Sequence, residues 1–149
     1  MSTHQARLEW RRETNEFVYQ TYNRDHQWVF DGGIKVTASA SPYFLGNPAC
    51  VDPEEAFVAS LASCHMLTFL AIAAKKRFVV NSYSDQAVGY LEKNAAGQYA
   101  LTEVTLKPKI DWGGERTPSA EELKQMHDGA HHQCFIANSV KTEVNIESQ

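Results

Sequence analysis

The sequence is poor in cysteine, with three in 149 residues, an odd number at wide spacings. A secreted domain held together by disulfides is therefore not indicated, and reduced or reactive thiols fit a reducing compartment better. Basic residues are fewer than acidic ones, and the net charge is −4. This charge argues against a nucleic-acid partner. The first residues are polar and lack the apolar segment of a secretory signal. These absences predict a cytoplasmic protein.

No internal repeat and no low-complexity tract interrupts the chain. With 43% hydrophobic and 21% charged residues, the composition is that of a folded protein rather than a disordered one. A chain of this length usually builds one hydrophobic core. We therefore predict a single domain covering residues 1–149.

Formal charge is missing altogether from residues 56–74, a run of nineteen positions. A long helix is predicted from Pro53 to Arg77, because Asp52 suits the N-cap, Pro53 the first helical position and Lys75 the last turn. Such a helix would be about 37 Å long, roughly the diameter of a compact chain of this size. It carries apolar residues on nearly every face, so one layer of strands cannot cover it.

Two structures would cover this helix: a second copy of the chain, or a lipid bilayer, which needs about 20 apolar residues. The membrane interpretation is the weaker one. Ser60, Cys64, His65 and Thr68 would lie near the bilayer centre, where polar groups are costly. We therefore predict a buried helix in an obligate homodimer, with no membrane.

The remaining pattern predicts strands on both sides of the helix, and hence an α+β fold. A second helix begins at Thr117 with Pro118, or at the capping box Ser119 to Glu122, and carries Cys134 near its far end. The predicted strands are residues 7–12, 17–22, 26–30, 34–39, 84–92, 99–110 and 140–146.

The cysteines have two interpretations when each is taken alone. Cys64, in the middle of the apolar helix, is either a small buried hydrophobe, as most free cysteines are, or a reactive thiol. Cys134 stands seventy residues later and can pair with Cys64 only if the two helices cross at that level. Cys50 lies in the loop before the long helix and is treated as incidental.

Together these residues form a recognisable combination. The segment Pro53-Glu54-Glu55, then Cys64 ten positions after Glu54, then Cys134 and a closing strand resembles the OsmC/Ohr family of organic hydroperoxide reductases. The resemblance covers nearly the whole chain. It implies an OsmC-like fold, with antiparallel sheets packed around long central helices in an intertwined homodimer.

The resemblance also implies roles for particular residues. Cys64 would be the peroxidatic thiol and Cys134 the resolving thiol that forms a disulfide with it, while Glu54 and an arginine hold the thiolate. Residues 41–52 contain no arginine, so Arg24 is the best candidate, with a solvated turn residue as the open alternative. An organic hydroperoxide would be the substrate and an external dithiol the reductant, with no cofactor.

Helix geometry separates two of these residues within one chain. Glu54 and Cys64 are ten residues apart, which is about 15 Å along a helix axis. They therefore cannot touch within one helix. The glutamate beside a given Cys64 should come from the partner subunit.

Other interpretations stay open. His65 and Phe135 stand where the family often has an aromatic residue and a proline, so a divergent subgroup without peroxidase activity fits as well. His127, His131 and Cys134 share one helix face at i, i+4 and i+7 and could complete a zinc site with Cys64 or His65. A small-ligand-binding protein without turnover is the remaining alternative.

Overall fold

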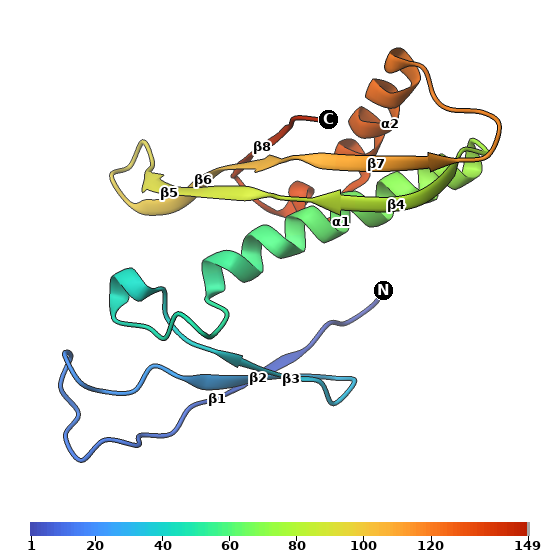
Figure 1. The fold of residues 1–149 in the computed structure, drawn as a ribbon. Coiled ribbons are helices and arrows are strands. Elements are labelled where there is room, and N and C mark those ends of the chain that lie inside the picture. Colours follow the sequence, from blue (N-terminus) through green and yellow to red (C-terminus); the bar gives the residue numbers. More distant parts are fainter. Residues whose placement is uncertain (149) are drawn as a thin grey trace. The chain divides into compact units, whose positions relative to one another are not determined.

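The computed structural model describes residues 1–148, in two compact units. The first unit is Met1–Ala56 and the second begins at Phe57. Helix α1 (Pro53–Lys75) starts at the end of the first unit and continues into the second (Figure 1). A single domain over residues 1–149 stays a prediction.

The first unit is a three-stranded antiparallel sheet in the order β1-β2-β3. Its strands are β1 (Ala6–Glu9), β2 (His26–Phe30) and β3 (Lys35–Ala38), followed by the short 3-10 helix η1 (Pro42–Phe44). The predicted strand over residues 17–22 is wrong. The N–H groups of Thr21 and Tyr22 both donate to the carbonyl of Val18, so this segment closes turns and has no strand partner within the described residues.

Between Phe57 and residue 148 the second unit contains five strands. They are β4 (Val79–Asp85), β5 (Val88–Lys93), β6 (Tyr99–Leu106), β7 (Pro108–Gly113) and β8 (Glu143–Ile146). β4 pairs with β7 and β5 with β6, both antiparallel, while β8 joins β6 in parallel. In Figure 1 the β4–β5 and β6–β7 segments form two long neighbouring ribbons.

The predicted strands 84–92 and 99–110 each cross a break between two observed strands. At this break the N–H of Lys107 donates to the Asp85 carboxylate at 2.7 Å. A side chain thus takes the donor that a continuous ladder would have used. The alternating pattern of apolar residues continues across the break, so it gave no sign of the interruption.

Both ends of α1 have a local cause. The N–H of Glu55 donates to Asp52 Oδ1 at 2.7 Å, and the N–H of Asp52 donates back to Glu55 Oε2 at 3.2 Å, a reciprocal capping box. The helix ends at Lys75, two residues before the predicted Arg77. Arg77 itself is left-handed, with φ 63°, and the N–H of Phe78 reaches back to the Ala73 carbonyl.

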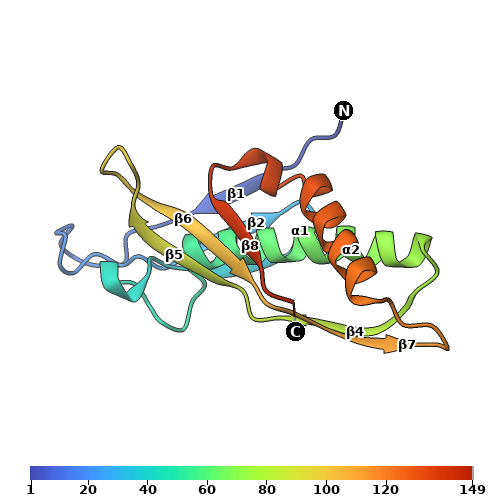
Figure 2. The same cartoon turned by 90° about the horizontal axis from the view of Figure 1, so that it is seen from above.

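Helix α2 (Ala120–Gln133) begins at the second of its two predicted starts. Ser119 is the N-cap and exchanges hydrogen bonds with Glu122, which completes a capping box. Cys134 is the C-cap, and the short 3-10 helix η2 (Ala137–Ser139) follows. Figures 1 and 2 both show α2 beside the C-terminal half of α1.

One stripe of α1 is buried by its own chain: Leu61, His65, Phe69 and Ala73, at every fourth position. Leu61 packs with Val104 and Leu106, while Phe69 and Ala73 pack in a second cluster with Phe78, Met126 and Ala130. His65 thus stands between two apolar clusters.

Much of α1 is only partly covered by the chain itself. Leu67 is 61% exposed, and only 22% of the most apolar window of the helix is buried. Among the described residues α1 is the one helix whose length and hydropathy would allow it to cross a membrane. In the predicted homodimer, a second copy of the chain would bury this apolar surface.

Phe69→Ala should lower the free energy of unfolding by about 3 to 5 kcal/mol, because Phe69 is fully buried and its removal leaves a cavity between α1, α2 and β7. Urea unfolding followed by circular dichroism measures this. Leu8→Ala, at a side chain that is 67% exposed, should change the same quantity by less than about 0.5 kcal/mol. Equal effects of the two substitutions would contradict this account of the core.

Candidate functional site

Two cysteines from distant parts of the sequence meet where α2 crosses α1. Cys64 lies in the middle of α1 and is half-buried, whereas Cys134 caps α2 and is 1% exposed. Both are free thiols. The Cys64 thiol is near enough to that of Cys134 to raise its pKa. Pairing of Cys64 with Cys134 required the two helices to cross at this level, and they do.

The two thiols have different surroundings. Burial raises the pKa of Cys134, and the neighbouring Cys64 thiol raises it further, while the N–H of Ala137, which donates to Cys134 Sγ at 3.4 Å, lowers it. A buried thiol whose pKa is raised stays protonated and reacts slowly. Cys64, the more accessible of the pair, is thus the better placed to meet a substrate first.

A pair of buried histidines lies at the same crossing. His65 Nε2 and His127 Nδ1 are 3.0 Å apart, and the two ring planes differ by 9°. Phe69 stacks on His127 with 4.5 Å between ring centroids. His65 is 1% and His127 4% exposed, so this hydrogen bond is shielded from water.

Both histidines are neutral at pH 7. Burial lowers the pKa of His65 to about 4, and the nearby His127 and His131 act in the same direction. Burial likewise lowers the pKa of His127 to about 4, against the opposing effect of Asp128. In the neutral pair one ring donates its N–H and the other accepts it.

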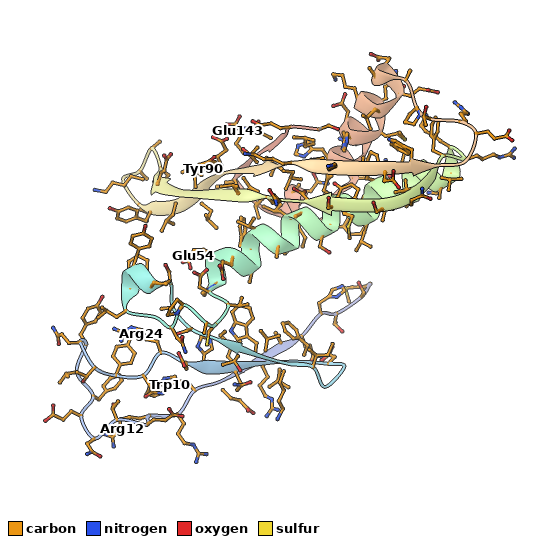
Figure 3. All side chains as sticks on the ribbon, viewed as in Figure 1. Trp10, Arg12, Arg24, Glu54, Tyr90 and Glu143 are labelled. Carbon is orange, nitrogen blue, oxygen red and sulfur yellow. The ribbon has the colours of Figure 1, made fainter. Side chains whose placement is uncertain are left out.

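Arg24 lies in the connection between β1 and β2, within the first unit (Figure 3). Its Nη1 donates to the Tyr22 carbonyl at 2.9 Å and its Nη2 to the Tyr19 carbonyl at 2.7 Å. The guanidinium also lies over the Tyr22 ring, 4.0 Å from the centroid. Arg24 lines a cavity of about 430 Å³ with Trp10 and Phe17, so it is a held, half-buried residue rather than a solvated turn residue.

Glu54 lies in the first turn of α1 (Figure 3), also within the first unit, and is half-buried. Within residues 1–148 no ion pair includes Glu54 or Arg24. The structure thus brings together Cys64 and Cys134, and the roles of Glu54 and Arg24 stay predictions.

The described residues contain no group of three or more His, Cys, Asp or Glu side chains arranged to hold a metal ion. The zinc hypothesis needed His127 and His131 to turn toward a common centre with Cys134. Instead, His127 Nδ1 is taken by the hydrogen bond to His65. The i, i+4, i+7 spacing correctly placed these side chains on the face of α2 toward α1, but the His65–His127 pair itself was not predicted.

The comparisons with known proteins bear on this arrangement. Residues 46–149 match the family model described as OsmC-like protein. The chain belongs to the OsmC-like protein family. An OsmC-like protein of unknown function from Vibrio cholerae is 51% identical, with 100% of both chains covered and a TM-score of 0.97. Both the family and the OsmC-like α+β fold expected from Glu54, Cys64 and Cys134 are thereby confirmed.

Two further relatives carry names that refer to hydroperoxides. A hydroperoxide reductase from Mycoplasma genitalium is 29% identical over 98 residues, which are 65% of this OsmC-like chain and 67% of the relative. An organic hydroperoxide resistance protein from Bacillus subtilis has a TM-score of 0.70 at 16% identity, with 99% and 98% of the two chains covered. The second likeness concerns the fold alone.

Acid should destabilise this OsmC-like protein through the histidine pair. The folded-state pKa values, about 4, lie below the ordinary 6.5, so the unfolded chain binds more protons between these values and the free energy of unfolding falls as pH falls through that window. A pKa difference of one between the folded and unfolded states corresponds to about 1.4 kcal/mol per histidine. The free energy of unfolding should therefore fall by several kcal/mol.

The measurement is urea unfolding at about pH 7 and about pH 5. A double variant, His65→Gln with His127→Asn, has no imidazole to protonate at this position and should lose clearly less stability over the same interval. Equal losses in the variant and the parent protein would contradict the assignment.

Proposed function

We propose that this protein is a cytoplasmic, homodimeric thiol peroxidase that reduces organic hydroperoxides. The observation that carries the proposal is the meeting of the Cys64 and Cys134 thiols, seventy residues apart in sequence, at the crossing of α1 and α2. Membership of the OsmC-like family and the relative named hydroperoxide reductase support the same reaction.

In the first step the Cys64 thiolate attacks the terminal peroxide oxygen. The O–O bond breaks, the substrate leaves as an alcohol after taking up a proton, and Cys64 becomes a sulfenic acid. In the second step the sulfur of Cys134 attacks that of Cys64. An S–S bond forms, the S–O bond breaks, and the hydroxyl leaves as water with the proton of the Cys134 thiol.

An external dithiol completes the cycle. It reduces the Cys64–Cys134 disulfide by thiol–disulfide exchange and is itself oxidised to a disulfide. The chain's own residues then need no cofactor for any step.

An apolar cavity supports an organic hydroperoxide as the substrate. It measures about 410 Å³ and is lined by Leu67, Thr68, Ala71, Gln133, Phe135 and Asn138. Thr68 donates to the Cys64 carbonyl, and Phe135 directly follows Cys134, so two of the lining residues are neighbours of the two cysteines. Apolar walls favour an alkyl or aryl substituent over the small polar hydrogen peroxide.

The thiolate needs a cation nearby, because Cys64 lies in mid-helix, where the positive end of the helix dipole does not reach. We assign this role to Arg24 of the second subunit, held in place by Glu54 of that subunit. Two of the five N–H donors of Arg24 bind carbonyls, which leaves three to bridge a carboxylate and a thiolate. The uncovered apolar face of α1 supports the homodimer that such sharing requires.

Cysteine variants test the chemistry. With a bulky alkyl hydroperoxide and a dithiol, Cys64→Ser should lose all turnover, since no thiol remains to attack the peroxide. Cys134→Ser, treated with the hydroperoxide in the absence of the dithiol, should consume about one equivalent per subunit and stop at the sulfenic acid, which dimedone traps. Cys50→Ser is the matched control and should keep wild-type turnover.

Multiple turnovers by Cys64→Ser would overturn the assignment of that residue. Absence of turnover in the parent protein with alkyl hydroperoxides would favour a small-ligand-binding protein instead.

Subunit mixing tests the shared site. Glu54→Gln and Cys64→Ser homodimers should each be inactive. A mixed dimer has one site with intact Cys64 and intact Glu54 from opposite chains, so activity should return after the subunits exchange. Mass spectrometry confirms exchange, which needs mild denaturant because the apolar interface is extensive.

A mixture of Glu54→Gln with Glu54→Gln/Cys64→Ser subunits is the control and should stay inactive, since it contains no intact Glu54. If exchange is complete and the first mixture also remains inactive, Glu54 does not serve the cysteine of the other chain.

A further inference from the structure

The hydrogen bond between His65 and His127 joins the two helices that carry the thiols. Apart from the contact between the thiols themselves, it is the one side-chain hydrogen bond between α1 and α2 within residues 1–148. Apolar side chains such as Phe69 and Met126 also pack between these helices. Apolar contact is non-directional and tolerates sliding, whereas a hydrogen bond fixes distance and angle.

The position of this bond relates it to the thiols. His65 directly follows Cys64 on α1, and His127 lies two turns before Cys134 on the same face of α2. Disulfide formation requires the two Cα atoms to be roughly 4.4 to 6.8 Å apart. A slide of α2 by a single turn, about 5.4 Å, would take Cys134 out of reach of Cys64.

Packing alone does not account for the two histidines. His65 Nδ1 and His127 Nε2 are buried and have no hydrogen-bond partner among residues 1–148, and the same is true of His131 Nδ1. A buried polar atom without a partner costs stability, so leucine at these two positions would pack at lower cost.

Proton transfer does not account for them either. The pKa of each imidazole is about 4, whereas that of the Cys134 thiol is raised above its ordinary value. Transfer of a proton from the thiol to either imidazole is therefore unfavourable by more than about 10⁴-fold. The pair is thus not the base that activates Cys134.

We propose that the His65–His127 hydrogen bond holds α1 and α2 in the register in which Cys134 reaches the Cys64 sulfenic acid. The two histidines are then positioning residues for disulfide formation and have no part in the attack on peroxide. The inference rests on the proposed peroxidase function for its biological meaning, but the helix register can be tested without peroxide.

The test separates the two steps in a single turnover of the reduced protein. His65→Leu and His127→Leu should consume the first equivalent of alkyl hydroperoxide at the parent rate. Disulfide formation, followed by acid quench and mass spectrometry, should slow by about tenfold, as expected for the loss of one hydrogen bond. Dimedone-trapped sulfenic acid should accumulate accordingly.

Conservative variants provide the rescue. Gln at position 65 places a polar atom near that of Nε2, and Asn at position 127 places one near that of Nδ1, so His65→Gln and His127→Asn should keep the fast second step. The converse pair, His65→Asn and His127→Gln, misplaces the polar atom and should be slow; these variants serve if the leucine variants do not fold. His132→Asn, at an exposed neighbour on α2, is the matched control.

Two results would overturn the inference: equal slowing of both steps in the leucine variants, or a second step as fast as in the parent protein. A double leucine variant no slower than either single one would show that the two residues act through their shared bond.

A thiol oxidant such as diamide allows the rate of Cys64–Cys134 disulfide formation to be measured without peroxide. If the parent protein does not turn over peroxide but its Cys64–Cys134 closure by diamide slows in the leucine variants, the proposed function fails and the positioning role stands. Unchanged closure by diamide would overturn the positioning role.

Discussion

The crossing of α2 over the C-terminal half of α1 is the contact on which the rest of the second unit depends. Phe69 is the centre of it, since it contacts His127 on α2 as well as Tyr83 and Trp112 on the strands. This packing buries the inner stripe of α1 and brings Cys134 to Cys64. Loss of the crossing would remove both the core and the thiol pair.

The same crossing combines apolar and polar groups in an unusual order. Leu61 and Phe69 each belong to an apolar cluster, and between them His65 introduces a hydrogen-bonding group that is nearly inaccessible to water. Because an unpaired polar group in the interior is costly in free energy, each of the two buried imidazoles depends on the other as its hydrogen-bond partner. The histidine pair therefore constrains the helices more tightly than apolar contacts of the same size would.

The outer surface of α1 presents a different constraint. One stripe of the helix is used by its own chain, and residues such as Leu67 remain exposed even though the helix carries no charge from Ala56 to Ala74. Apolar surface on this scale marks an interface. In the homodimer that we propose, a second copy buries this surface and lends Arg24 and Glu54 to Cys64 of the other chain, so stability and catalysis would share one requirement.

The sequence by itself determined the start of α1, the fold class and the family, and it narrowed the start of α2 to two positions. Asp52, Pro53 and Glu55 start α1, and Ser119 with Glu122 starts α2, because capping depends on residues within a few positions of each other. The pattern of Glu54, Cys64 and Cys134 sufficed for the family for the same reason: it is a matter of spacing along the chain.

Only the tertiary structure decided what depends on residues far apart in sequence. The break at Lys107 arises from the carboxylate of Asp85, and the loss of the strand over residues 17–22 arises from turns that no alternation of side chains reveals. The His65–His127 bond joins positions 62 residues apart. The sequence placed each histidine on a helix. The angle at which two helices cross is set by the packing of the whole interface, and that angle brings the two imidazoles together.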